Sequence, residues 1–140
     1  MTIKMYSLKL KCYVNVLSIN MIDRKVIYWN PHKGWLQSDS IYNVVSKNRW
    51  EAFLVFYYKW KNLKEKPFNA PKIHAGTRKG KGKKKDKMIF FLSGKEDNVG
   101  NFNIYDTYEE AEEALKIYIY ETYYQHLSEA ERKELLNFLE

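Results

Sequence analysis

Apolar and polar residues alternate along 6–17, the first regular pattern in the chain. The even-numbered positions from 8 to 16 hold five apolar residues: Leu8, Leu10, Cys12, Val14 and Val16. Alternation with a period of two predicts a half-buried β-strand. One or two further strands are predicted by the segment 25–30 (KVIYWN) and by Trp35, which follows the turn sequence 30–34. We therefore expect an antiparallel meander in the N-terminal third.

A helical pattern replaces the alternation near residue 48. Asn48 can cap a helix, and Glu51 follows it at the spacing of a capping box. Aromatic residues then recur at steps of three and four, and other apolar residues fill many positions between them. The sequence therefore predicts a helix over 48–65 that is buried around most of its circumference.

The rest of the chain predicts three strands and two helices. The segments 72–76, 87–93 and 101–106 have strand composition, while Thr107 and Ser128 each stand three residues before a glutamate, as in a capping box. The predicted order is ββ(β)αβββαα, an α+β fold with antiparallel sheets, one buried aromatic helix and two C-terminal helices. With 140 residues, 45% of them hydrophobic, we expect a single domain, 1–140.

Charge is distributed unevenly along the chain, although the formal net charge is only +7. Residues 1–95 hold 21 Lys and Arg against 5 Asp and Glu, whereas residues 96–140 hold 3 against 12. A basic excess of this size suits an anionic partner such as nucleic acid. The alternative is that the two portions face each other and neutralise within the fold.

The densest positive charge lies in residues 76–87, GTRKGKGKKKDK. This segment has almost no apolar surface to bury, so we expect a flexible, solvated hairpin loop between two strands. Its basic residues are candidates for sequence-independent, salt-dependent phosphate contacts: Arg78, Lys79, Lys81, Lys83, Lys84, Lys85 and Lys87. The alternative is a loop that only confers solubility.

Two further segments are candidates for partner binding. Trp29 and Trp35 flank the 30–34 turn and could form a surface patch, whereas most other aromatic residues are expected in the core. Glutamates cluster at the start of the helix predicted after Thr107, where the helix dipole favours them, but they could also dock on a basic protein surface. The candidate residues are Trp29, His32, Lys33, Trp35, Glu109, Glu112 and Glu113.

The sequence offers little for catalysis. His32, His74 and His126 are scattered, Cys12 is the single cysteine, and the glycines match neither a phosphate loop nor a dinucleotide fingerprint. We therefore expect a protein that is not an enzyme and has no cofactor or metal. An active site assembled from distant elements would not be visible as a sequence motif. A histidine that lies beside another reactive group in one pocket would therefore make an enzyme a candidate again.

Cellular location follows from similar observations. A single cysteine without a zinc-like cluster fits a reducing, cytoplasmic compartment. The longest apolar run is residues 52–58, far short of the roughly 20 residues that cross a bilayer, so we expect no membrane segment.

These observations favour a small nucleic-acid or ribonucleoprotein-binding protein that uses the basic loop for phosphate contacts to RNA or DNA. The alternative is an inhibitor or adaptor, encoded by a phage or another mobile element, that binds a nuclease or immune complex through an aromatic and acidic surface. Such a protein would act against host defence, as anti-CRISPR proteins do. The bias toward Lys, Asn, Ile and Tyr suits an AT-rich genome, and compact proteins of this kind are frequent in phages and other mobile elements.

Overall fold

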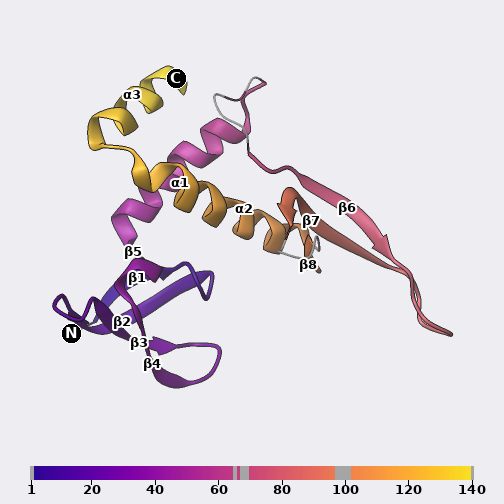
Figure 1. The fold of residues 1–140 in the computed structure, drawn as a ribbon, viewed down its shortest axis with the longest axis horizontal. Coiled ribbons are helices and arrows are strands. Elements are labelled where there is room, and N and C mark those ends of the chain that lie inside the picture. Colours follow the sequence, from indigo (N-terminus) through magenta and orange to yellow (C-terminus); the bar gives the residue numbers. More distant parts are fainter. Residues whose placement is uncertain (1, 65, 67–69, 97–101, 140) are drawn as a thin grey trace. The chain divides into compact units, whose positions relative to one another are not determined.

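The computed structural model describes residues 2–64, 66, 70–96 and 102–139. Two antiparallel sheets and three α-helices confirm the predicted α+β class (Figure 1). Contacts between residues divide the chain into two compact units, Met1–Lys61 and Asn62–Glu140, which we describe separately. That the chain behaves as one domain stays a prediction.

The N-terminal unit contains a five-stranded sheet and one long helix. Its elements are β1 (Ile3–Ser7), β2 (Cys12–Asn20), β3 (Lys25–Asn30), β4 (Trp35–Ser40), the 3₁₀ helix η1 (Ile41–Asn43), β5 (Val44–Ser46) and α1 (Lys47–Lys61). The strand order is β4-β3-β2-β1-β5, with every neighbouring pair antiparallel. The meander predicted for the N-terminal third is thus confirmed and extended by β5.

The single strand predicted over 6–17 is wrong, because the chain reverses at residues 8–11. Lys11 takes a left-handed φ of 59°, and its backbone N–H donates to the Ser7 carbonyl oxygen at 2.8 Å. The reversal leaves Ser7 opposite Cys12 and Met5 opposite Val14. The residues that face the core are odd-numbered in β1, such as Met5, and even-numbered in β2, such as Val14. The alternation nevertheless runs through the turn in the sequence, because Leu8 is buried and Leu10 packs on the apolar cluster of β2.

One face of this sheet carries an apolar cluster. Val14 and Val16 of β2, Val26 and Tyr28 of β3, and Val44 of β5 are all buried in it. On the other face, Tyr6 of β1 stacks on a tryptophan of α1. The sheet therefore contributes apolar side chains in both directions where α1 covers it.

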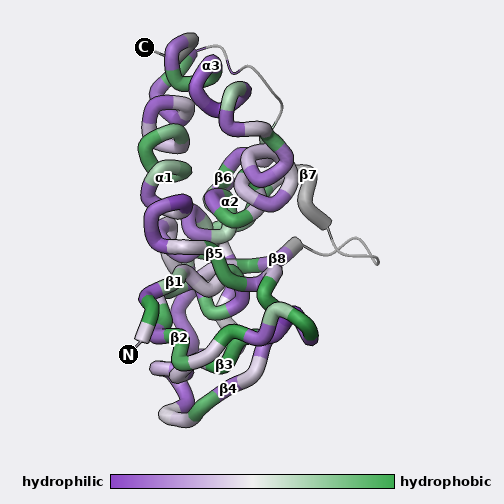
Figure 2. Tube along the Cα trace, turned by 90° about the vertical axis from the view of Figure 1, so that its left-hand side faces the viewer, coloured by the Kyte–Doolittle hydropathy of each residue, from purple (hydrophilic) through white to green (hydrophobic). Residues whose placement is uncertain are grey.

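Helix α1 confirms the predicted aromatic helix but differs from it in detail. Ser46 rather than Asn48 caps its first turn, since the Ser46 hydroxyl accepts from the Arg49 N–H at 3.3 Å. The helix ends at Lys61, and residues 62–64 are not helical. Only one stripe is buried, because Val55 and Tyr58 are 52% and 45% exposed, and Figure 2 shows the alternating hydropathy along the helix.

The C-terminal unit contains a three-stranded sheet and two helices. Its elements are β6 (Ile73–Arg78), β7 (Lys87–Glu96), β8 (Phe102–Tyr105), α2 (Tyr108–Thr122), the 3₁₀ helix η2 (Tyr124–His126) and α3 (Glu129–Leu139). The strand order is β6-β7-β8, and α2 packs on all three strands. The predicted three strands and two C-terminal helices are confirmed.

Both predicted caps of these helices are present. The Thr107 hydroxyl accepts from the Glu110 N–H at 3.2 Å. Ser128 and Glu131 form a reciprocal box, with 3.2 Å between donor and acceptor in each direction. In the part of the chain that the structure describes, no helix is long and apolar enough to cross a membrane.

Candidate nucleic-acid interface

The basic segment lies at the end of the β6–β7 hairpin. The two strands pair as far as Arg78 opposite Lys87, and residues 79–86 connect them. β8 pairs with β7 only from Phe90 onward. The hairpin therefore continues as a two-stranded ribbon, and Figure 1 shows it extending past β8. We call residues 78–87 the basic tip.

Two glycines give the tip a defined backbone shape. The Gly80 N–H donates to the Asp86 carboxylate at 3.0 Å, and the Lys84 N–H donates to the Lys81 carbonyl oxygen at 3.2 Å. A Cβ at Gly80 would overlap the Lys84 carbonyl oxygen, and Gly82 has a φ of 64°. That the loop is flexible stays a prediction, but these glycines also permit a close approach of its backbone to itself.

This backbone shape gathers the candidate side chains around one concavity of about 540 Å³. Its lining consists of glycine and basic residues alone: Arg78, Lys79, Gly80, Lys81, Lys84, Lys85 and Lys87. Six of the seven basic residues singled out in the sequence thus meet at one site. The seventh, Lys83, lies outside the lining.

Positive charge in the tip is only partly compensated. Arg78 and Lys87 face each other across the strands, and like charges in that position destabilise a sheet. Lys87 donates to the Asp106 carboxylate at 2.9 Å. Between residues that the structure describes, no ion pair involves a lysine of the 79–86 loop. An anion in the concavity would relieve this repulsion.

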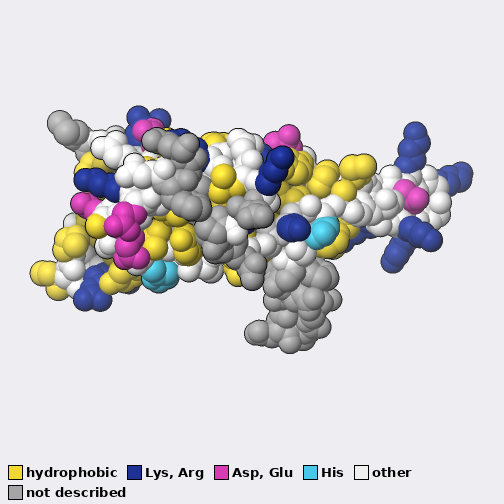
Figure 3. Space-filling view, turned by 90° about the horizontal axis from the view of Figure 1, so that it is seen from above, with side chains coloured by type: hydrophobic (Ala, Val, Ile, Leu, Met, Phe, Trp, Pro, Cys, Tyr) yellow, Lys and Arg dark blue, Asp and Glu magenta, His cyan; other side chains and the backbone are white. Residues whose placement is uncertain are grey.

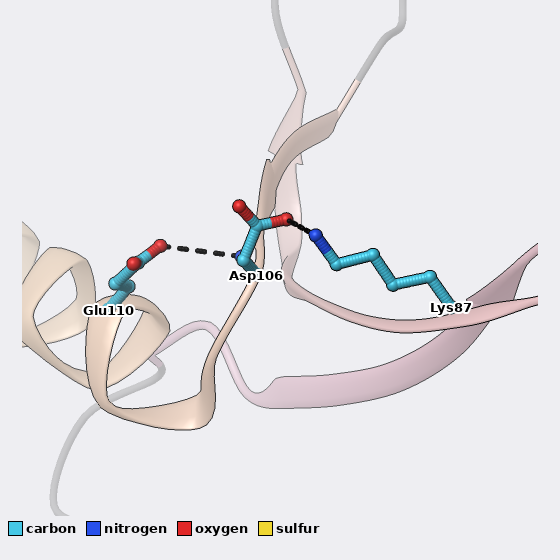
Figure 4. A network of polar contacts seen from close by, with 3 residues as sticks. All are labelled: Lys87, Asp106 and Glu110. Atoms are coloured by element: carbon cyan, nitrogen blue, oxygen red, sulfur yellow. Dashed lines mark hydrogen bonds and ion pairs between the residues drawn. The ribbon is translucent and has the colours of Figure 1, made fainter.

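Asp106 connects the ribbon to the start of α2. Its carboxylate accepts from Lys87, and its backbone N–H donates to the Glu110 carboxylate at 3.3 Å (Figure 4). The hydrogen bond from Lys87, with the charges of Lys87 and Arg78, holds the pKa of Asp106 below its usual value. Asp106 is therefore ionised at neutral pH and competes with any external anion for Lys87.

The charges of the two units clarify the asymmetry seen in the sequence. The N-terminal unit holds 10 Lys and Arg against 3 Asp and Glu, and the C-terminal unit holds 14 of each. Half of the basic residues of the C-terminal unit lie in the ten-residue tip. The C-terminal unit thus has no net charge but concentrates its cations at one end of a hairpin.

Replacing Gly80 with alanine is expected to weaken anion binding without unfolding the sheet. The new methyl group would push the Lys84 backbone away and open the concavity. We expect the affinity for a nucleic-acid probe to fall about fivefold or more, measured by fluorescence anisotropy. Gly76→Ala is the matched control, since a Cβ there meets side chains and no backbone, the Phe91 ring at 3.4 Å and Ile89 at 3.8 Å. Equal affinities of the two variants would contradict a preformed site.

Replacing Asp106 with asparagine is expected to strengthen nucleic-acid binding about two- to fivefold, because Lys87 becomes available to phosphate. The lowered pKa of Asp106 means that its charge is lost only as pH falls through that pKa, below the usual 3.8. The gain should therefore be constant from pH 6 to 8. Glu109→Gln removes an equal charge from a residue that does not pair with Lys87, so it should gain less. Weaker binding by Asp106→Asn would refute the competition.

The second set of candidate residues lies around the β3–β4 turn. His32 and Lys33 are exposed in it, and their backbone N–H groups donate to the buried Asn30 side chain at 2.9 and 3.1 Å. Trp29 and Trp35 are 45% and 56% exposed. The turn thus brings both tryptophans to the surface.

The two tryptophans do not form one patch, because strand pairing separates them. Trp29 lies opposite Leu36, whereas Trp35 lies opposite Asn30. Since neighbouring residues of a strand point to opposite faces, Trp29 and Trp35 lie on opposite faces of the hairpin.

The face that holds Trp29 carries two residues that the sequence reasoning missed. Leu36 and Ile27 share the face of Trp29 and are 55% and 41% exposed. We call Ile27, Trp29 and Leu36 the apolar strip. The sequence feature that could have identified them is the alternation in 25–30. There the odd-numbered Ile27 and Trp29 point away from the face of the buried Val26 and Tyr28.

The acidic candidates on α2 have separate roles. Glu109 is exposed in the first turn, where the helix dipole favours a negative charge. The Glu113 carboxylate accepts from Lys116 at 3.1 Å, and Lys116 is only 7% exposed. Glu113 therefore compensates a buried ammonium, while Glu109 and the half-buried Glu112 remain candidates for a partner surface.

The structure brings together Cys12 and His32, two reactive residues that lie in separate segments of the sequence. The Cys12 sulfur lies 3.6 Å from Nε2 of His32. Burial raises the pKa of the Cys12 thiol, the opposite of what an activated nucleophile requires. Among the described residues no group of three His, Cys, Asp or Glu could hold a metal ion. The pair thus lacks the features of a catalytic centre, and the absence of enzyme activity stays a prediction.

Comparison of the chain with protein-family models, curated protein sequences and solved structures gives no match, so no relative bears on its function.

Proposed function

We propose that this protein binds nucleic acid by gripping backbone phosphates with the basic tip. The observation that carries the proposal is the concavity lined by six cationic side chains and one glycine. Loop lysines without ion pairs to described residues, next to the opposed Arg78 and Lys87, form a site that an anion would stabilise. Phosphate groups are the anions that lysine and arginine bind in nucleic acids.

A loop that only confers solubility does not require this arrangement. Solubility needs net charge and exposure, which a disordered lysine-rich segment would supply as well. Here Gly80 approaches the backbone of Lys84, and Asp86 accepts a backbone N–H. The only acid of the tip thus holds the backbone together, which favours a binding site over a mere solubilising loop.

The test is a titration of fluorescent DNA and RNA oligonucleotides across a salt series. About five phosphate contacts would give a slope of log affinity against log salt of about −4.5. Between 50 and 200 mM salt, that slope lowers affinity about 500-fold. Absence of binding at 50 mM salt would refute the proposal.

A protein partner at the apolar strip is a second candidate function. Ile27, Trp29 and Leu36 are each at least 41% exposed and adjoin one another on β3 and β4. An exposed tryptophan among aliphatic side chains is typical of an anchor in protein interfaces. A nuclease or immune complex is the partner class that a protein encoded by a mobile element would be expected to bind.

Replacing Trp29 with serine should remove such a partner but leave nucleic-acid binding unchanged. The loss of the central side chain of the strip would cost the complex at least tenfold in affinity. The measurement is co-purification of candidate nuclease complexes with the tagged chain. Trp35→Ser is the matched control, since Trp35 is similarly exposed on the other face. If Trp35→Ser loses the partner and Trp29→Ser keeps it, the apolar strip is not the interface.

A further inference from the structure

The part of the β6–β7 ribbon next to the tip is narrow and free of a third described strand. Three residue pairs lie between the start of β8 pairing at Phe90 and the loop: Gly76 with Ile89, Thr77 with Met88, and Arg78 with Lys87. At 3.3–3.4 Å a residue, this free ribbon is about 10 Å long. The major groove of B-form DNA is about 12 Å wide and about 8.5 Å deep, and it admits a two-stranded ribbon.

We infer that the basic tip enters the major groove of duplex DNA, an inference that rests on the nucleic-acid-binding function proposed above. The minor groove of B-form DNA is about 6 Å wide and admits two strands with their side chains only when the duplex is bent and the groove widened, which costs deformation energy. The major groove of an RNA duplex is deep and narrow, so side chains cannot reach into it. Of the regular duplexes, B-form DNA is the one whose dimensions match this ribbon.

The placement of charge agrees with insertion between two phosphate backbones. Figure 3 shows basic side chains projecting in several directions around the end of the hairpin, with an acidic group between them. Lys83 lies outside the concavity that the other cations line. A tip with cations on more than one side can contact both strands that border a groove, whereas a single-sided patch contacts one.

Single strands fit the tip less well than a duplex. Proteins that bind single strands without sequence preference combine a basic groove with aromatic side chains on which bases stack. Residues 76–87 contain no aromatic residue. The tip therefore supplies phosphate contacts without a stacking surface, a combination suited to a duplex whose bases remain stacked on one another.

Arg78 is the residue of the tip best suited to reach a base edge. It is the one arginine among the seven basic residues of 78–87, and it stands in the ribbon rather than in the loop. A guanidinium can donate two hydrogen bonds to O6 and N7 of guanine, which an ammonium matches less well. We therefore assign the loop lysines to phosphates and Arg78 to guanine in the groove.

The test compares three ligands with equal numbers of phosphates at one ionic strength: a DNA duplex, an RNA duplex of the same sequence and a single DNA strand. We expect the DNA duplex to bind at least tenfold more tightly than the others. The major-groove ligand methyl green should displace the protein, and the minor-groove ligand netropsin should not. Equal binding of all three ligands, or displacement by netropsin alone, would overturn the groove assignment and leave the phosphate-binding function standing. No binding of any ligand would overturn both.

The role of Arg78 is tested separately with a variant that keeps the positive charge. Replacing guanine with 7-deazaguanine removes the N7 acceptor, and we expect the wild-type protein to lose about tenfold in affinity on that duplex. Arg78→Lys should bind both duplexes about equally, because it retains the charge but not the paired donors. If wild type and Arg78→Lys respond alike to the missing N7, Arg78 does not contact guanine there.

Discussion

Replacing the five loop lysines with glutamine is expected to abolish nucleic-acid binding at physiological salt while leaving both sheets folded. The substituted residues are Lys79, Lys81, Lys83, Lys84 and Lys85. All are exposed, so we expect each change to alter stability by no more than about 0.5 kcal/mol. Binding should fall at least 500-fold, and the slope of log affinity against log salt should rise above −2, since only Arg78 and Lys87 remain.

The control for this variant removes the same charge elsewhere. In the control variant, five exposed lysines of the N-terminal unit are replaced together by glutamine: Lys4, Lys9, Lys25, Lys33 and Lys47. Both variants then have the same net charge, and anisotropy in one buffer compares them directly. If the control loses as much affinity as the tip variant, attraction by the overall charge explains the binding and the concavity does not.

Local chemistry made much of the fold predictable. Thr107 with Glu110 and Ser128 with Glu131 satisfy backbone N–H groups within one helical turn, so their spacing alone locates two helix starts. The basic tip was visible because its residues are consecutive in the chain. Neighbours in a short loop must lie close together, whatever the rest of the molecule does.

Features that depend on pairing over longer distances were not predictable. The alternation over 6–17 does not reveal a turn, because the turn residues Leu8 and Leu10 are apolar and continue the even-numbered apolar positions of β2. Likewise, Trp29 and Trp35 look equivalent on either side of the 30–34 turn. The register between β3 and β4 separates them and places Leu36 beside Trp29 instead.

The same reason hid the contacts that modify the candidate site. Lys87 and Asp106 are 19 residues apart, and Cys12 and His32 are 20 apart, so neither pair forms a motif. Both depend on which strands lie next to each other. In the tip, the concavity depends on the close approach of Gly80 to the backbone of Lys84. From composition alone, the same glycine indicates only a flexible loop.

Replacing Trp50 with alanine is expected to destabilise the N-terminal unit by about 3–5 kcal/mol. Trp50 is 2% exposed, stacks on Tyr6 with ring centroids 3.9 Å apart, and lies 5.1 Å from the Phe53 ring. Its removal leaves a large cavity between β1 and α1. The loss is a large fraction of the 5–15 kcal/mol that stabilises a typical domain. Urea unfolding followed by tryptophan fluorescence measures it, since all four tryptophans lie in residues 1–61.

Trp35→Ala is the control, because Trp35 is 56% exposed and its loss should change the free energy of unfolding by no more than about 0.5 kcal/mol. Similar midpoints for the two variants would contradict the packing assigned to Trp50. Trp50→Ala also tests the prediction of a single domain, because the basic tip belongs to residues 62–140. If DNA binding disappears at the urea concentration that unfolds residues 1–61, the chain unfolds as one domain. Binding that persists beyond that concentration means that the two units are independent, and that residues 62–140 alone suffice for the phosphate site.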